Sequence, residues 1–260
     1  MNSNTIKNSL EDGLAILTLH RPEVFHSFNR EMSHALRHQL ESAAANDEVR
    51  AIMITGSGKA FSAGQDLSEA TDVDGPTMET ILNEHYNPLV RTLRSIDKPV
   101  IAAVNGVAAG AGANLAICCD IILASTSASF IQAFSKIGLI PDSGGTFFLP
   151  RMIGWHRAMA YMMTAEKMTA QEAKDFGLVF KLFDDASFTS DSISFGKNIA
   201  AMPTRALVLT KKALNASSQN SLDEQLAEEL KLQMEAGKTY DFREGVAAFL
   251  EKRKPAFKGK

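Results

Sequence analysis

The chain is poor in cysteine, and its two cysteines are neighbours. Among 260 residues only Cys118 and Cys119 carry a thiol, side by side in an apolar run. Adjacent cysteines rarely form an unstrained disulfide, so a disulfide-stabilised secreted fold is excluded. The pair is typical of small buried side chains in a reduced compartment.

Long apolar runs are also missing. Residues 1–8 have no apolar core of the kind that a signal peptide needs, and no uncharged apolar run approaches the length of a membrane span. We therefore expect a soluble, cytoplasmic protein that does not act at a membrane.

Neither sign of charge dominates. The chain has 27 Lys and Arg against 30 Asp and Glu, a net charge of −3, and basic residues cluster only in the solvated tail, at 252–254 and 258–260. A nucleic-acid partner is therefore not expected. The apolar content of 45% can form the core of one large domain, or of a domain with an appendage.

Several common catalytic motifs are incomplete. Leu115 occupies the third glycine position of a dinucleotide-binding loop, and Ala60 follows a Gly-Lys pair where a P-loop needs Ser or Thr. Pro141 replaces the first glycine of a nucleophile elbow. His34 and His38 have the spacing of metal ligands but lie off the apolar stripe of their helix, which favours a solvated face. We expect no metal or redox cofactor.

What the sequence contains is an alternation of strand-like and helix-like segments, typical of an α/β core with parallel strands. The expected strands are 14–19, 51–55, 100–104, 120–124 and 178–183. Asn29 can cap a helix over 30–45, and residues 67–77 have the composition of a mobile loop. Further helices are expected over 78–96, 146–152, 155–164, 170–176, 192–201, 204–217, 222–236 and 240–253.

Two turns rich in small residues follow strand-like runs. One is FSAGQD at 61–66, and the other is GVAAGAGAN at 106–114, which leads into a helix-like segment. Small residues let a ligand approach the backbone, and N–H groups at a helix start suit an anion. If both turns face one point, the N–H groups of Ala63 and Ala111 would form an oxyanion hole. Tight packing of strand against helix is the alternative interpretation.

Six further segments complete a pattern along nearly the whole chain: LHRP at 19–22, IMITG at 52–56, KPVIAAVNG at 98–106, CDI at 119–121, GLIPDSGGT at 138–146 and REGVAAFLEKRK at 243–254. In this order they resemble the crotonase (enoyl-CoA hydratase/isomerase) superfamily. The resemblance implies an α/β fold with a spiral core of ββα units over 1–200. It also implies a C-terminal helical region over 201–260 that builds homotrimers or dimers of trimers. The implied substrate is an acyl-CoA thioester, with no separate cofactor.

Asp142 is the catalytic carboxylate that the resemblance implies, although from the residues alone an N-cap of the following helix is favoured. Hydratases of the family carry two catalytic glutamates, and the matching positions are Asn114 and Phe134, which cannot act as general acid or base. The resemblance therefore implies only that Asn114 and Phe134 contact the substrate. In several isomerases of the family an aspartate at the position of Asp142 moves the proton. We expect apolar neighbours to raise the pKa of this carboxyl. The second position of the hole is Ala111, where the family usually has glycine.

Matching positions also predict a coenzyme A site. Gln65, Asp66 and Leu67 match the segment that contacts adenine, largely through its backbone, and Arg21 and Val24 match the segment near the pantetheine and phosphates.

Two residues near the C-terminus complete the predicted coenzyme A contacts. Phe249 and Lys252 are three residues apart and would share a face of the last helix. In relatives this region can reach the nucleotide of a neighbouring subunit. For Lys252 an ordinary surface lysine is an equally good interpretation. His26 stands where the family often has asparagine.

We therefore expect an isomerase of acyl-CoA thioesters. Within the family, the chain resembles members that rearrange a ring epoxide on an aromatic acyl group and also shift enoyl-CoA double bonds. The alternatives are an enoyl-CoA hydratase, a delta3-delta2-enoyl-CoA isomerase of fatty-acid oxidation and, in a different class, a non-catalytic binder of CoA esters.

Overall fold

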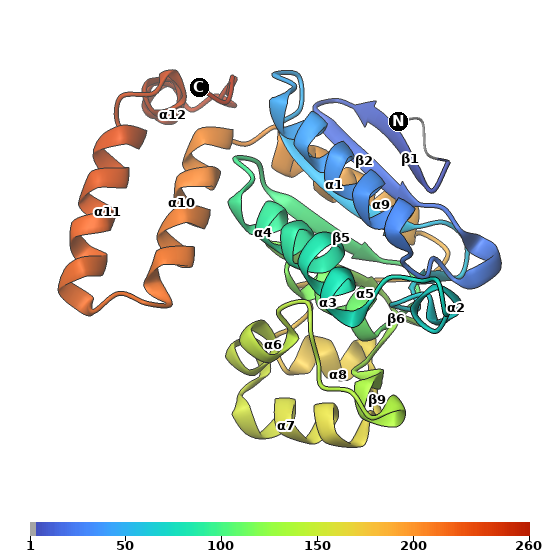
Figure 1. The fold of residues 1–260 in the computed structure, drawn as a ribbon. Helices are drawn as coiled ribbons and strands as arrows, with labels where there is room; N and C mark the ends of the chain where they lie inside the picture. The colour runs from blue at the N-terminus through green and yellow to red at the C-terminus, as the bar shows by residue number, and fades with distance from the viewer. Residues whose placement is uncertain (1–3) are drawn as a thin grey trace.

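The computed structural model describes residues 4–260 and contains two β-sheets with helices packed against them (Figure 1). The larger sheet has the strand order β1-β2-β3-β5-β7-β10. Its neighbouring strands are parallel except for the β1–β2 pair. The strands are β1 (Ile6–Glu11), β2 (Leu14–Leu19), β3 (Ala51–Gly56), β5 (Val100–Val104), β7 (Ile121–Ser125) and β10 (Lys181–Phe183).

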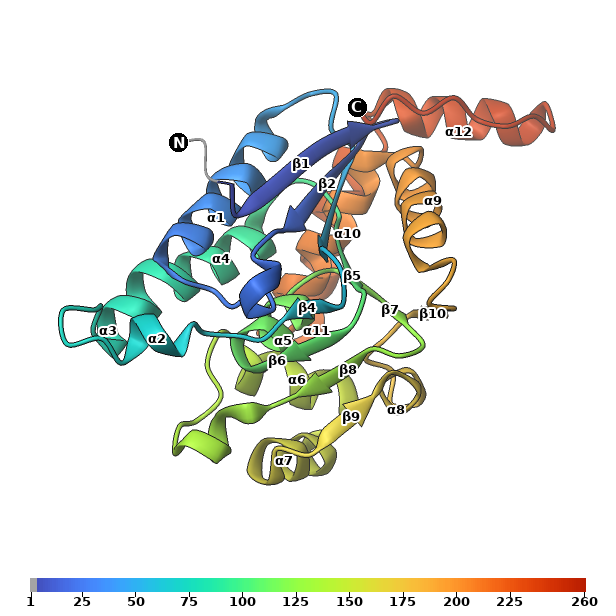
Figure 2. The same ribbon diagram turned by 90° about the vertical axis from the view of Figure 1, so that its right-hand side faces the viewer.

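Helices cover both faces of this sheet, which explains the continuous apolar runs of its central strands. Leu17 and Leu19 of β2 belong to the core beneath α1 (Arg30–Ala45) and α4 (Asn87–Ser95). Leu14 and Ile16 point the other way, into the core that they share with α9 (Phe188–Ala200). Figures 1 and 2 show α1 and α4 on one face and α9 on the other.

The smaller sheet has the strand order β4-β6-β8-β9 and is parallel except for β8–β9. Its strands are β4 (Ala60–Ser62), β6 (Val107–Ala109), β8 (Ser129–Ile131) and β9 (Lys167–Thr169). The first three follow directly after β3, β5 and β7, so the chain repeatedly steps from the large sheet to the small one. After β6 it enters α5 (Gly110–Ile117).

The remaining helices form two groups. α3 (Met78–Thr80) and a π-helical turn (Ile81–Tyr86) continue directly into α4, and the short α2 (Leu67–Ala70) precedes them in the chain. Below the small sheet lie α6 (Gly145–Ile153), α7 (Trp155–Thr164) and α8 (Ala170–Asp175) (Figure 1). Short 3-10 helices occupy Pro22–Val24 and Ala133–Ile137.

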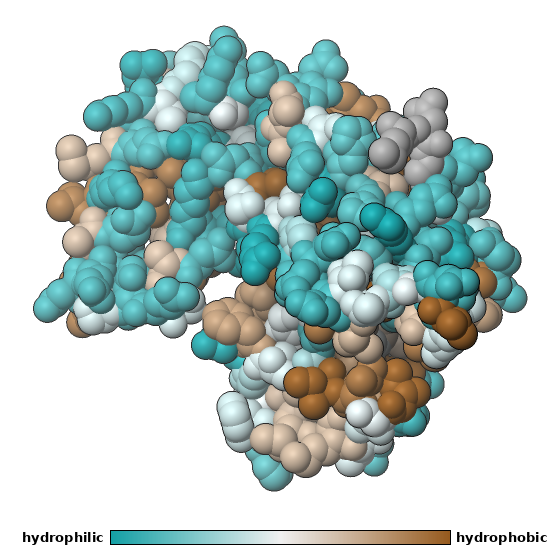
Figure 3. Space-filling model, viewed as in Figure 1, coloured by the Kyte–Doolittle hydropathy of each residue, from teal (hydrophilic) through white to brown (hydrophobic). Residues whose placement is uncertain are grey.

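The last three helices, α10 (Thr204–Ser217), α11 (Leu222–Ala236) and α12 (Tyr240–Leu250), form an arm beside the sheet-containing body (Figure 1). On α11 only Leu232 is buried, whereas an apolar stripe at helical spacing is exposed: Leu222, Leu226, Leu230 and Met234. Brown side chains mark this region in Figure 3. The arm therefore presents an apolar surface that nothing within residues 4–260 covers.

The predicted α/β class is confirmed, and the helices predicted over 30–45, 155–164, 204–217 and 222–236 begin and end where expected. Several details differ. The helix predicted over 192–201 begins earlier, at Phe188, and the strand predicted over 178–183 spans only Lys181–Phe183. The predicted loop 67–77 contains α2, the helix predicted over 78–96 is interrupted by the π turn, and the last helix ends at Leu250 rather than 253. The sequence also gave no indication of β1 or of the three-residue strands of the small sheet. Within residues 4–260 no helix has the length and apolar character to cross a bilayer.

Candidate active site

The two turns rich in small residues lie against each other, as predicted. Gly64 has φ +94°, and a Cβ on it would lie 2.8 Å from the Ala109 carbonyl oxygen and 3.4 Å from the Ala111 nitrogen. Glycine is required there by both the positive φ and the close approach. The turn at 63–66 therefore meets the first turn of α5.

The N–H groups at this junction differ in what they bind. The Ala63 N–H donates to the Phe25 carbonyl at 2.9 Å, so the prediction that it is free to form an oxyanion hole does not fit the structure. In the part of the chain that the structure describes, the Gln65 and Ala111 N–H groups donate to no protein acceptor. Ala109, at the N-cap of α5, provides no side-chain cap. The Gln65 and Ala111 N–H groups are therefore the candidate oxyanion donors of the two turns.

Asp142 lies half-buried in the turn that precedes α6. The N-cap of α6 is Gly144 and no side chain caps it, so the interpretation of Asp142 as an N-cap is wrong. The Ser143 hydroxyl donates to the Asp142 carboxylate at 2.8 Å. Burial raises the pKa of the Asp142 carboxyl, and the bond from Ser143 offsets only part of this effect.

Of the three apolar neighbours expected around Asp142, two are exposed and the third is buried beside the start of α5. Phe134 is buried and its ring lies 3.9 Å from a Cβ built on Gly110, at the start of α5. Ile137 and Ile140 are 53% and 81% exposed, so they do not enclose the carboxyl group.

Asn114 is fully buried on α5, and both ends of its amide are bound to protein. Its Nδ2 donates to the Asp142 main-chain carbonyl at 2.9 Å, and its Oδ1 accepts from Gln132 Nε2 at 2.8 Å. The prediction that Asn114 contacts the substrate therefore does not fit the structure.

Tyr86 belongs to the site although no spacing pattern predicted it. Its hydroxyl donates to Gln65 Oε1 at 2.8 Å, and its ring is 1% exposed at the end of the π turn. Burial raises the pKa of Tyr86 well above its usual value, and the negative charge of Asp142 adds to the effect. Tyr86 therefore stays protonated and holds the Gln65 side chain.

The segments predicted to bind coenzyme A come together beside this junction. The Arg21 guanidinium lies 2.9 Å from the Asp66 carboxylate and also donates to the Ser27 carbonyl. Asp66 caps α2 through the Ser68 N–H, with Leu67 51% exposed beside it. Burial opposes ionisation of Asp66, but the bonds from Ser68 and Arg21 outweigh it and lower its pKa.

Val24 and His26 belong to the same loop as Arg21. Val24 is half-buried at the end of a 3-10 turn. The buried His26 ring accepts from the Arg21 N–H at 2.9 Å and bonds the Ser57 carbonyl at 2.7 Å, so it ties the loop to the end of β3.

Phe249 and Lys252 do not join the site within one chain. Figures 1 and 2 both show α12 far from α2 and α5. The helix ends at Leu250, and Lys252 has φ +55°, so the prediction of a shared helix face is wrong. Phe249 is 83% exposed.

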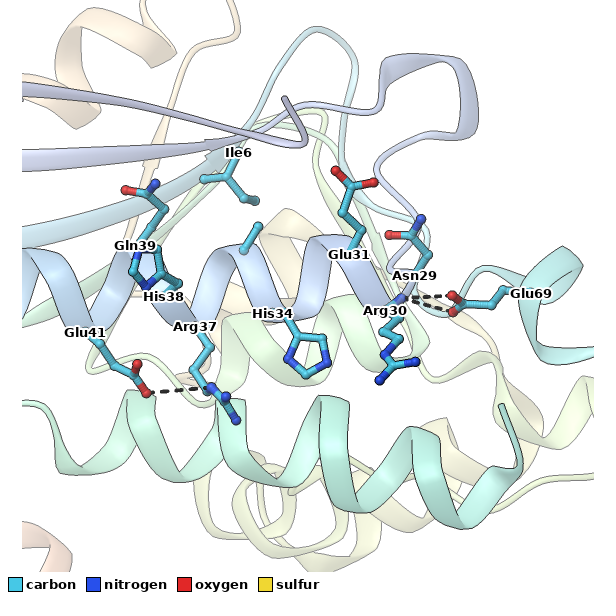
Figure 4. Close-up of a pocket in the computed structure, with 11 residues that line it drawn as sticks. Ile6, Asn29, Arg30, Glu31, His34, Arg37, His38, Gln39, Glu41 and Glu69 are labelled. Atoms are coloured by element: carbon cyan, nitrogen blue, oxygen red, sulfur yellow. Dashed lines mark hydrogen bonds and ion pairs between the residues drawn. The ribbon is translucent and has the colours of Figure 1, made fainter. Parts of the chain in front are cut away.

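A cavity of ≈ 960 Å³ lies over α1 (Figure 4). It is lined by His34 and His38 together with Arg30, Glu69 and other polar residues. Across residues 4–260 no group of three His, Cys, Asp or Glu side chains could hold a metal ion. Both cysteines are buried and free, and burial raises the pKa of Cys118 to about 12.

Comparison with known proteins gives consistent matches over the full chain. Residues 9–260 match the family described as enoyl-CoA hydratase/isomerase. The chain is 47% identical over 260 residues to the probable enoyl-CoA hydratase of Rhodobacter capsulatus, covering all of both chains. It is 45% identical over 258 residues to the 1,2-epoxyphenylacetyl-CoA isomerase of Escherichia coli, covering 98% of each. The enoyl-CoA hydratase structure from Polaromonas sp. JS666 superimposes with TM-score 0.90 and 35% identity, covering 97% of this chain and 99% of that one.

Proposed function

Because the chain belongs to the enoyl-CoA hydratase/isomerase family, whose members act on CoA thioesters, we propose that it is an isomerase in which Asp142 moves the proton. The observation that carries the proposal is the contrast between Asp142 and Asn114. Asp142 is a half-buried carboxylate with a raised pKa, whereas the position of a hydratase glutamate holds an amide already bonded to protein. A hydratase needs a second carboxylate to position water, and Asn114 cannot supply it.

The proposed reaction moves one proton and adds no atoms. The Asp142 carboxylate removes a proton from the carbon next to the thioester of a 3-enoyl-CoA, and the thioester oxygen becomes an enolate. The double bond moves, and the protonated carboxyl returns the proton two carbons away. The Gln65 and Ala111 N–H groups would bind the developing oxyanion, each contributing about 3 kcal/mol to its stabilisation. A carboxyl with a raised pKa is suited to both halves of this cycle.

The proposed natural substrate is 2-(1,2-epoxy-1,2-dihydrophenyl)acetyl-CoA, with enoyl-CoA double-bond shift as a second activity. Identities of 45% to the Escherichia coli isomerase and 47% to the Rhodobacter capsulatus protein do not separate isomerase from hydratase. Asn114 and Phe134 stand where hydratases of the family carry their catalytic glutamates, and the absence of both carboxylates favours the isomerase. Fatty-acid delta3-delta2 isomerisation uses the same proton transfer and is the second candidate.

For coenzyme A we propose contacts by Arg21, Val24 and the backbone of 65–67, completed by Phe249 and Lys252 of a neighbouring copy. The exposed stripe of α11 supports a homotrimer, because a surface of this kind is seldom left uncovered. Replacing Leu226 and Leu230 together by Glu should convert the assembly to monomers in light scattering. A monomeric wild-type protein would contradict the trimer.

The test of function compares three substrates. With a 3-enoyl-CoA, ultraviolet absorbance follows formation of the conjugated 2-enoyl thioester; the ring epoxide is followed by liquid chromatography; and crotonyl-CoA reports hydration. We expect isomerisation by the wild type, none by Asp142→Asn, and little hydration. Fast hydration would favour the hydratase, and tight binding without turnover of any substrate would favour a non-catalytic binder.

A further inference from the structure

We infer that Gln132 and Asn114 form an amide relay that fixes the position of Asp142 relative to the Ala111 N–H. The inference rests on the proposed function in that Asp142 is the proton-transferring group. The relay is the chain of bonds from Gln132 Nε2 to Asn114 Oδ1 and from Asn114 Nδ2 to the Asp142 carbonyl. Asn114 and Gln132 are positioning residues, because neither amide has surface available to the substrate: Asn114 is 0% and Gln132 3% exposed.

The direction of the relay is fixed by the main chain. The Asp142 carbonyl can only accept, so the Asn114 amide must present its nitrogen there and its oxygen to Gln132. The Gly145 N–H donates to the same carbonyl at 2.8 Å. Among the described residues Gln132 Oε1 has no partner, so the orientation of Gln132 depends on its single bond to Asn114.

The turn at residues 142–145 packs closely against the Asn114 amide. A Cβ on Gly145 would lie 2.4 Å from Asn114 Nδ2, so only glycine allows this contact. Ser143 holds φ +49°, a conformation that non-glycine residues seldom adopt, and its carbonyl accepts from the Cys118 thiol one turn further along α5. The turn is therefore bonded to α5 at two points.

One helix thus carries both parts of the proposed chemistry. Ala111 and Asn114 are three residues apart on α5 and lie on the same side of it. The first offers its N–H to the oxyanion, and the second holds the turn that bears the base. Because the helix is rigid, the relay fixes the distance between base and oxyanion.

The experiment measures kcat and KM for a 3-enoyl-CoA from pH 5 to 9 on folded Asn114→Asp, Asn114→Leu and Gln132→Met. In Asn114→Asp, the neutral carboxyl can still donate to the Asp142 carbonyl, but the ionised form repels it. Asp142 lies on the facing turn, and one turn along the helix the Arg94 guanidinium binds the Cys118 carbonyl and pairs with Asp120. Wild-type activity should rise with pH as Asp142 ionises, whereas this variant should give a bell-shaped profile and lose about 100-fold on the alkaline side.

The other two variants remove the bonds without adding an acid. Asn114→Leu should lower kcat about 100-fold at every pH with little change in KM, and Gln132→Met about fivefold, the effect of one lost hydrogen bond. The control is Asn215→Asp on α10, which makes the same exchange and also loses a bond to a main-chain carbonyl, that of Arg94. Its kcat and profile should match the wild type. Wild-type kcat in Asn114→Leu together with a wild-type profile in Asn114→Asp would overturn the relay.

A second readout separates the relay from the proposed function. If the wild type isomerises no CoA ester, the proposed function fails, and the relay is then judged by the carbon-13 resonance of the Asp142 carbonyl. That resonance should move in Asn114→Leu and stay in Asn215→Asp. An unmoved resonance in Asn114→Leu would overturn the relay regardless of activity.

Discussion

In two turns of this chain an aspartate accepts a hydrogen bond from a nearby serine hydroxyl, but the pKa values of the two carboxyl groups are shifted in opposite directions. In the turn before α2, Asp66 accepts the Ser68 hydroxyl at 2.5 Å, and in the turn before α6, Asp142 accepts the Ser143 hydroxyl at 2.8 Å. Arg21 lies against Asp66, whereas no cation of residues 4–260 forms an ion pair with Asp142. The pKa of Asp66 is accordingly lowered and that of Asp142 raised.

The difference fits the roles that we propose, in which Asp66 holds a loop in place and Asp142 transfers the proton. A carboxylate that is fixed in its ionised form by a guanidinium and a helix start is a poor proton carrier, but it anchors a loop well. A carboxylate without a counter-ion in a half-buried turn exchanges its proton near neutrality more readily. The environment of each group, rather than the residue type, decides its role.

The largest expected effect comes from replacing each aspartate by asparagine. Asp142→Asn should lower kcat at least about 1000-fold, the loss of a general base, while CoA-ester affinity stays within about twofold. Asp66→Asn keeps the cap on α2 but loses the ion pair, and should act mainly on KM. Steady-state kinetics and calorimetric binding of a CoA ester measure both, and equal losses of kcat in the two variants would remove the distinction.

Much of the fold, and part of the candidate site, could be predicted from the sequence. The central strands are apolar on both faces, and α8, α11 and α12 each follow a residue whose side chain caps the helix, so the approximate positions of these elements were predictable. The family pattern identified Asp142 and the two turns of small residues. These features depend on local composition and spacing.

What could not be predicted depends on contacts between distant segments. Ala63 was expected to offer its N–H, but the carbonyl of Phe25, 38 residues earlier, accepts it, and no local pattern encodes that bond. The role of Tyr86 likewise depends on the π turn that aims its hydroxyl at Gln65. The three-residue strands of the small sheet are too short for a period of two to be recognised.

The second effect is an opposite pH dependence of stability for the two asparagine variants. The folded-state pKa of Asp142 is raised, so ionisation costs the wild type stability as pH rises above about 3.9, the unfolded value. The folded-state pKa of Asp66 is lowered, so its contribution is present above that pH and is lost as pH falls. As the pH rises from 3 to 7, the free energy of unfolding of Asp142→Asn should therefore increase relative to that of the wild type, and that of Asp66→Asn should decrease relative to it. Each pKa unit of difference is worth about 1.4 kcal/mol. Urea denaturation across this range measures both, and slopes of the same sign would contradict the assignment.

The smallest effect concerns the two serines. The Ser143 hydroxyl stabilises ionised Asp142, so Ser143→Ala should raise that pKa further and move the rising limb of kcat/KM by about one pH unit to higher pH. Ser68→Ala should leave the limb in place, because Asp66 takes no part in proton transfer and keeps Arg21. Ser143→Gly should move the limb as far as the alanine variant but unfold at a higher temperature, since glycine accepts φ +49° without strain. A limb that moves with Ser68→Ala, or stays fixed in both Ser143 variants, would show that the Asp142 carboxyl is not the group that titrates in catalysis.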